Sequence, residues 1–440
     1  MVLTGTAIVP FDSAVNVAFP AIIAHFRIPI AAIQWVVVPY TLTYAALTLI
    51  FGRLGDLLGH KRVFLAGAAI SMAGYLGCAF APSYALLIGA RIIQGIGAAL
   101  VLGCGAALAT ALYPDSARVR ILGLYTMAFG LGSAGGPLLG GLLVGQFGWA
   151  SVFWFRAPFA ALALLGGLAL PRAPRRAAGG RFDALGGMAF IVAMACFDLG
   201  LSALQPGAGG PLRALALGVA ACAAAALFLD RQRRARAPLI ALAPFAARDF
   251  RAVNAANVLL NLAAFSILLL LPFYFDRVLH LSTLALGAML ALSQAGVVVA
   301  APLAARLVGR LGRARLARYG AAGVAAGQIG ILLGSGITGD PALLAVAMAV
   351  VGLGLGTFQL AYFDLVTARI PAADRGVAAS LVMVTRTLGL VIGASLLLLL
   401  FRRIGGAEAA GFLRGLHAAQ AMAAALAIAA LLWLWRVAED

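Results

Sequence analysis

Apolar stretches of about 20 residues recur along the whole chain, and they constrain its fold more than any other feature. A helix of that length crosses the hydrocarbon core of a bilayer, where backbone polar groups must be paired within the helix itself. The composition agrees, because 64% of the residues are hydrophobic and 10% are charged, against about 25% charged in soluble proteins. The sequence therefore predicts an all-α transmembrane protein.

Hydropathy divides the chain into fourteen predicted spans with short connections, so consecutive helices should run antiparallel. The first span follows Met1 without a basic segment or a convincing cleavage site, so we expect a permanent helix and leave open a start further upstream. The spans are expected at residues 2–25, 33–53, 62–81, 84–112, 119–145, 149–170, 184–205, 211–229, 252–275, 283–308, 317–337, 341–368, 376–401 and 412–436.

Basic residues give the orientation. With the N-terminus inside, 23 of the 32 Lys and Arg residues lie in cytoplasmic segments, 6 lie outside and 3 lie within spans. Arg402 and Arg403 are the pair that fits this arrangement worst. The asymmetry predicts that both termini are cytoplasmic, and it explains the net charge of +18 without nucleic acid as a partner.

An internal repeat indicates two related halves. Residues 52–62, after the second span, are similar to residues 305–315, after the tenth, at an offset of 253. Duplicated helix sets are typical of transporters that bind substrate between the halves. We therefore predict a six-helix bundle at 1–175, an inserted helix pair at 176–235 and a second six-helix bundle at 236–440.

The stretch 52–62 reads Gly-Arg-Leu-Gly-Asp-Leu-Leu-Gly-His-Lys-Arg, and we call it the loop motif. Its first glycines would allow close helix approach, and Gly59 would allow a tight turn between two helices. Asp56 could accept hydrogen bonds from a helix N-terminus or pair with an arginine. The candidate residues here are Gly52, Asp56, Gly59, Lys61 and Arg62.

Ionisable residues within predicted spans are costly in a bilayer and mark candidate functional sites. Asp12 lies near the middle of the first span, where it could carry a proton, attract a cationic substrate, do both in exchange, or form a structural hydrogen bond with Asn16. Arg91 and Gln94 lie in the fourth span, and Arg91 could either take part in coupling or extend its head group towards water.

A glycine-rich segment in the fifth span would form a smooth helix face kinked by a proline. We call it the glycine motif, and its candidate residues are Gly132, Gly136, Pro137, Gly140 and Gly141.

These segments resemble the major facilitator superfamily, and in particular its fourteen-helix drug:proton antiporter branch. The loop motif matches the superfamily's cytoplasmic loop, Arg91-x-x-Gln94-Gly95 matches its arginine motif, and the glycine motif resembles the antiporter motif of its exporters. Residues 11–20, which include Asp12, resemble the branch's first-helix motif. The resemblance implies the major facilitator fold, here two six-helix bundles with two inserted central helices, and a loop motif that holds the outward-open state.

One position departs from that pattern. Arg156 stands where the branch has an asparagine, which adds a second arginine to the first half and leaves the substrate's charge open. Weaker candidates are Asp198, which could be structural, Asp364, which could line an inner vestibule, and Arg386, which could pair with Asp364 or Asp12.

Function follows from the resemblance and from the absence of rival motifs. There is no phosphate-binding loop, so transport would need an ion gradient, and protons are implied by the resemblance alone. There is also no catalytic motif and no metal-ligand spacing among the cysteines and histidines, so neither an enzyme nor a metal or other cofactor is expected. A channel would more often show a symmetric ring or filter.

We therefore expect a multidrug efflux transporter of a bacterial inner membrane that exports amphiphilic or cationic compounds by alternating access, driven by protons. It would bind small molecules, protons and lipid, but not nucleic acid, and would work as a monomer. The alternative is a specific exporter or importer of one metabolite or natural product.

Overall fold

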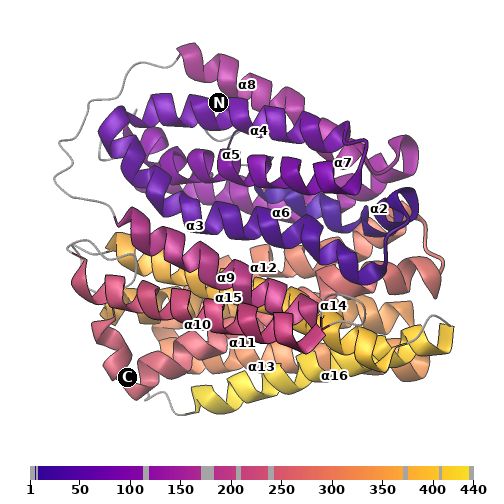
Figure 1. The fold of residues 1–440 in the computed structure, drawn as a ribbon. Helices are drawn as coiled ribbons and strands as arrows, with labels where there is room; N and C mark the ends of the chain where they lie inside the picture. The colour runs from indigo at the N-terminus through magenta and orange to yellow at the C-terminus, as the bar shows by residue number, and fades with distance from the viewer. Residues whose placement is uncertain are drawn as a thin grey trace. The chain divides into compact units, whose positions relative to one another are not determined.

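The computed structural model describes residues 5, 8–111, 118–169, 183–204, 210–235, 242–369, 375–405 and 409–435, and every regular element in them is helical (Figure 1). Contacts between Cα atoms divide the chain into two compact units. The first comprises residues 1–188 and 281–288, and the second comprises residues 189–280 and 289–440. The boundary residues predicted for the inserted helix pair adjoin or fall within stretches outside the described residues, so the predicted three-part division stays a prediction.

The first unit contains four long helices and several shorter elements. In chain order its elements are η1 (Pro10–Asn16), α2 (Phe19–Phe26), η2 (Ile30–Ile33), α3 (Gln34–Leu58), α4 (His60–Ala79), α5 (Tyr84–Ala111), α6 (Arg118–Phe147), α7 (Ser151–Trp154) and α8 (Ala157–Ala169). The first predicted span is therefore not one helix. Pro10 begins η1 and Pro20 lies in the first turn of α2, where the missing N–H of proline is tolerated.

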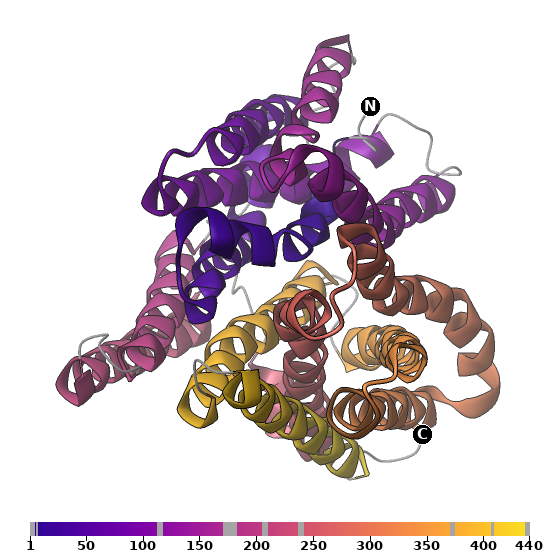
Figure 2. The same cartoon turned by 90° about the vertical axis from the view of Figure 1, so that its right-hand side faces the viewer.

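The second unit is built from long helices. Its elements are α9 (Ala184–Ala203), which begins in the first unit, α10 (Gly210–Arg234), η4 (Ala243–Ala246), α11 (Arg248–Arg277), α12 (Thr283–Leu311), whose first turns belong to the first unit, α13 (Arg313–Leu333), η5 (Gly334–Thr338), α14 (Pro341–Arg369), α15 (Arg375–Ile404) and α16 (Ala409–Leu434). The orange helices α13 and α14 lie side by side in Figure 2 and pack against each other.

Twelve helices among the described residues are long and apolar enough to cross a membrane. A further pair, Phe19–Phe26 with Ile30–Ala45, is also long and apolar enough when taken together, but it is bent by 115°. Each predicted span coincides with one or two of the described helices to within a few residues, the first only from Pro10 onward. The all-helical transmembrane fold is therefore confirmed, whereas the count of fourteen spans and the side of the termini stay predictions.

The repeat seen in the sequence is also present in the backbone. Gly59 separates α3 from α4 with φ of +95°, and Gly312 separates α12 from α13 with φ of +77°. The two glycines are 253 residues apart, which is the offset of the repeat. Only glycine adopts such angles without strain, so both halves use the same residue type to make the same tight turn.

Candidate functional site

The glycine motif positions the short helix that carries Asp12. Ser13 Oγ on η1 donates a hydrogen bond of 3.1 Å to the carbonyl oxygen of Ser133 on α6. A Cβ atom at Gly136 would overlap Ser13 Oγ, and one at Gly140 would lie 2.9 Å from the carbonyl oxygen of Ala14. Glycine is therefore required at both positions for η1 to lie this close to α6.

The same motif also packs against the start of α12. A Cβ atom at Gly141 would lie 3.0 Å from Leu284 Cα and 3.2 Å from Gly287 Cα. Pro137 and Gly132 are buried on the same helix, and the carbonyl of Pro137 faces Gly287. The five residues of the motif thus lie on a helix that is held between η1 on one side and α12 on another.

Asp12 lies at the centre of a cluster formed with Arg91, Gln94 and Arg156, which we call the Asp12 cluster. Arg91 donates two hydrogen bonds to the carboxylate, Nη1 to Oδ1 at 2.6 Å and Nη2 to Oδ2 at 2.7 Å. Arg156 Nη1 donates to Oδ1 at 2.8 Å, and Gln94 Nε2 donates to the same oxygen at 2.9 Å. Paired donors on a carboxylate fix both distance and orientation.

Backbone contacts orient these side chains. Arg91 Nε donates to the carbonyl of Val36 at 2.7 Å, and Arg156 Nε donates to the carbonyl of Val152 at 2.9 Å. Gln94 lies at a close contact between α4 and α5, because a Cβ atom at Gly74 would be 2.7 Å from Gln94 Cα. The cluster is therefore held by elements far apart in the sequence.

The charge of the cluster does not balance. Arg91 and Arg156 are 1% and 0% exposed, and their ion pairs within the described residues are both with Asp12, whose side chain is 16% exposed. One carboxylate thus faces two buried guanidinium groups, and Nη2 of Arg156 has no hydrogen-bond partner among the described atoms. The rings of Tyr40 and Tyr75 lie 4.2 Å and 4.7 Å from the two guanidinium carbons and stabilise part of the excess positive charge.

Asn16 is close in sequence but has a different partner. Its Nδ2 donates to the carbonyl oxygen of Ser13 at 3.1 Å, which closes a local turn in η1. The structural alternative of a hydrogen bond between Asp12 and Asn16 is therefore not what the structure shows.

The loop motif lies at the turn between α3 and α4. A Cβ atom at Gly52 would be 3.3 Å from the carbonyl of Gly103, so α3 and α5 are close here. Lys61 Nζ donates to the carbonyl of Leu168, in the last turn of α8, at 2.9 Å, and Arg62 is exposed. A cation at a helix C-terminus satisfies an otherwise unpaired carbonyl. The side chain of Asp56 lies outside the described part of the structure.

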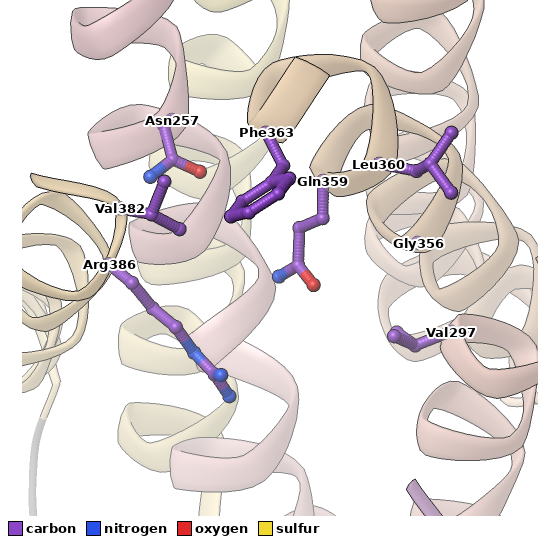
Figure 3. A pocket seen from close by; sticks show the side chains of 8 residues that line it. All are labelled: Asn257, Val297, Gly356, Gln359, Leu360, Phe363, Val382 and Arg386. Carbon is purple, nitrogen blue, oxygen red and sulfur yellow. The ribbon is translucent and has the colours of Figure 1, made fainter. Parts of the chain in front are cut away.

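The second unit contains a cavity of about 340 Å³ between α11, α12, α14 and α15, which we call the Arg386 cavity (Figure 3). Within the described residues, neither the guanidinium of Arg386 nor the amide of Gln359 has a hydrogen-bonding partner. Figure 3 shows these two side chains extending from α15 and α14 into the same space. The lining residues are Asn257, Val297, Gly356, Gln359, Leu360, Phe363, Val382 and Arg386.

Beside this cavity lies a neutral polar network that the sequence analysis missed. Tyr362 Oη donates to Asn254 Oδ1 at 2.9 Å and lies 2.9 Å from Thr385 Oγ1. Asn257 Nδ2 donates to the same threonine oxygen at 2.8 Å, and Asn261 Nδ2 donates to Asn257 Oδ1 at 2.9 Å. Asparagines at 254, 257 and 261 share one face of a helix, and that spacing in an apolar span was the signal available.

The two weaker acidic candidates lie apart from these sites. Asp198 on α9 is fully buried and accepts a hydrogen bond from Ser395 on α15, while its Oδ2 has no partner among the described atoms. Asp364 is 51% exposed, and its Oδ2 lies 3.9 Å from Nε of Arg313. Asp12 pairs with the arginines of its own cluster, so neither proposed partner of Arg386 forms an ion pair with it among the described residues.

Helices that can span a membrane, a buried charge cluster and an internal repeat are together typical of a polytopic transporter. A sequence model of the Major Facilitator Superfamily matches residues 2–394, so the chain belongs to that superfamily. The chain is therefore a multi-pass membrane transporter.

Three similar proteins are bacterial transporters or resistance proteins. The tetracenomycin C resistance and export protein of Streptomyces glaucescens is 30% identical over 92% of this chain and 76% of its own. The multidrug resistance protein Stp of Mycobacterium tuberculosis (strain CDC 1551 / Oshkosh) is 29% identical over 87% of this chain and 71% of its own. The riboflavin transporter RibZ of Clostridioides difficile is 28% identical over 87% of this chain and 83% of its own.

Solved structures agree on the fold. A peptide transporter POT in complex with sulfate superposes with a TM-score of 0.72 at 17% identity, covering 99% of this chain and 92% of that one. At this level of identity the likeness shows the fold alone.

Proposed function

We propose that this protein is a proton-coupled exporter of small amphiphilic compounds, acting as a multidrug efflux transporter in a bacterial inner membrane. The proposal includes fourteen spans, cytoplasmic termini and a functional monomer. Two relatives that confer resistance or export support efflux, and the short predicted connections and arginine-rich cytoplasmic segments support the topology.

The Asp12 cluster is the observation that supports the proposal of proton coupling. Asp12 is the one member that is partly exposed, and it is the counter-charge of two buried arginines. Protonation of Asp12 would leave both guanidinium groups without that counter-charge, so it must accompany a rearrangement of the cluster. Loss or gain of a proton at Asp12 would thereby be tied to movement of η1 and α5, which is what coupling requires.

The cluster argues against one sequence-based expectation. Attraction of a cationic substrate was one of the roles left open for Asp12, but here its two carboxylate oxygens accept hydrogen bonds from two arginines and a glutamine. A cation would therefore have to displace existing pairs before it could bind to this carboxylate.

A specific metabolite transporter is the second candidate. The riboflavin transporter RibZ matches this chain at nearly the same identity as the resistance proteins do, over a larger share of its own length. Under this candidate the same cluster and the same cycle would serve a single solute, and direction would need to be measured separately.

The test uses purified protein in proteoliposomes with an acidic lumen, a pH-sensitive dye inside and a panel of amphiphilic compounds added outside. Wild type should release protons when a substrate is added, and Asp12→Asn should abolish this release. Asp12→Asn combined with Arg156→Asn keeps the cluster's net charge, so it separates loss of coupling from loss of folding. Asp276→Asn changes an exposed aspartate and is the matched control.

Each outcome decides between the candidates. Proton release with many compounds supports multidrug export, whereas release with riboflavin or one other metabolite alone supports the specific transporter. Unchanged proton release in both Asp12 variants would refute the role of Asp12. Solute exchange without any proton movement would refute proton coupling but leave transport intact.

A further inference from the structure

Inside the second unit, the Arg386 cavity combines apolar walls with a cation and an amide that have no partner among the described residues. Arg386 is the twelfth residue of α15, which begins at Arg375, and so lies well within the helix, where an arginine needs a partner or a wet cavity. The cavity provides that space, and Arg386 is the one charged group among the eight described residues that line it. None of these eight residues carries a carboxylate that could receive a cation.

The remaining lining side chains indicate the size and polarity of a ligand that would fit the cavity. Gln359 presents an amide beside Arg386, while Asn257 is already bonded to Thr385 and Asn261. Phe363 is 49% exposed, and with Val297, Leu360 and Val382 it forms an apolar surface. A volume of about 340 Å³ is at the small end of ligand pockets, which run from about 300 to 1,000 Å³.

We propose that the Arg386 cavity binds small amphiphiles through an anionic oxygen group, with a carboxylate held by Arg386 and Gln359 and an aromatic or aliphatic body against Phe363. This inference rests on the proposed transport function and assigns its substrate class as anionic. A guanidinium binds a carboxylate through paired N–H donors, and a neighbouring amide N–H adds a third donor.

The first unit independently shows an excess of positive charge within its spans. Its Asp12 cluster has two guanidinium groups for one carboxylate, and Arg156 Nη2 has no partner among the described atoms. The deeply buried acid of the second unit, Asp198, is 0% exposed and bonded to Ser395. The described charges within the spans therefore favour an anion over a cation.

The experiment compares three naphthalene probes of equal size and different charge. These are 2-naphthoate, the neutral 2-naphthamide and the cationic 2-naphthylmethylammonium. Binding is measured by equilibrium dialysis against the full chain in lipid nanodiscs, with empty nanodiscs to correct for partition into lipid. The same probes are then tested for counterflow in proteoliposomes.

Wild type should bind 2-naphthoate at least about tenfold more tightly than either other probe, as expected for charge-assisted hydrogen bonds. Arg386→Gln should remove this preference, Arg386→Lys should retain part of it because it keeps the charge, and Gln359→Leu should weaken 2-naphthoate by a few-fold. Arg414→Gln removes an exposed arginine of α16, outside the cavity, and should leave the preference unchanged.

Three results would overturn the inference: equal or tighter binding of the cation, a carboxylate preference that survives Arg386→Gln, or no binding of any probe. Counterflow separates this failure from failure of the proposed function. Counterflow of amphiphiles regardless of charge would leave transport standing and refute the anion site. Binding of 2-naphthoate that depends on Arg386, with no counterflow of any probe, would support the site and refute transport of this class.

Discussion

In the first unit the buried cluster around Asp12 is charged and its members pair with one another, whereas in the second unit the buried network around Thr385 is neutral. Asp12 is held by two buried arginines, while Tyr362 and Thr385 join a set of asparagine amides. Arg386 of the second unit forms no hydrogen bond with that network among the described residues, and its side chain lines the adjacent cavity. The two units share a turn and a glycine spacing, so the repeat preserves helix packing and not the chemistry placed on it.

The shared packing is visible in two glycine pairs with the same spacing of four residues, Gly136 and Gly140 in the first unit and Gly389 and Gly393 in the second. In the first unit Gly136 and Gly140 on α6 lie against η1, which carries Asp12. In the second unit a Cβ atom at Gly389 on α15 would lie 2.6 Å from the carbonyl of Val258 on α11, which carries the asparagines. Equivalent helix pairs thus hold a charged cluster in one unit and a neutral network in the other.

The largest expected effect comes from removing the carboxylate in the first unit. Asp12→Asn should lower the stability of the protein by about 3–5 kcal/mol, because two buried guanidinium groups lose their counter-charge. Thermal unfolding in detergent measures this. Adding Arg156→Asn should recover part of the loss, and an absence of recovery would contradict the view that excess charge is the cause.

A smaller effect should follow from a methyl group at the glycine motif. Gly136→Ala should destabilise by about 1–3 kcal/mol and reduce transport, because the new Cβ overlaps Ser13 and displaces η1 with Asp12. Gly89→Ala on α5 has nothing within 4 Å of the new atom and serves as the control. Equal behaviour of the two variants in unfolding and transport assays would contradict the view that the glycine motif positions the Asp12 cluster.

Substitution in the neutral network should lower stability less than substitution in the Asp12 cluster. Thr385→Val should cost about 1–2 kcal/mol, because Asn257 Nδ2 loses its acceptor in a buried site. Thr357→Val removes a hydroxyl whose one hydrogen bond among the described residues is to the carbonyl of Leu353, and its effect should be within about 0.5 kcal/mol. A loss for Thr385→Val as large as that for Asp12→Asn would refute the contrast between the units.

Effects no larger than that of Thr385→Val should come from the two equivalent turns. Gly59→Ala and Gly312→Ala each place a side chain at positive φ in open space, so each should cost about 1–2 kcal/mol from backbone strain alone. Unfolding should therefore report the same loss for both. A transport defect confined to Gly59→Ala would show that the loop motif has a role that its counterpart lacks.

The positions of the helices were predictable because apolar runs, prolines and glycines act locally. The break within the first span was not predicted, although Pro10 and Pro20 signalled it. The choice of Asp12 and Arg91 as candidates needed only their place in apolar spans, and Arg156 was noticed as a departure from a motif. Their meeting could not be predicted, since Asp12 and Arg156 are 144 residues apart in the chain.

The Arg386 cavity and the asparagine network were harder to predict for a different reason. Charged residues are conspicuous within an apolar span, whereas asparagine, threonine and tyrosine carry no charge. Whether Arg386 is paired depends on the rotation of α14 and α15, which apolar runs do not fix. Asp198 and Asp364 illustrate the same point, because one is fully buried against Ser395 and the other is half exposed beside Arg313.

The contact between Lys61 and the end of α8 has a practical consequence. Lys61 is the single lysine among the 440 residues, since the other basic side chains are arginines. A fluorophore with an amine-reactive group would therefore attach to one side chain, in the loop motif, besides any free N-terminal amine. Because Lys61 Nζ is bonded to the carbonyl of Leu168, the labelling rate reports how often that bond opens. The native sequence thus carries its own single-site probe for motion of this loop during turnover.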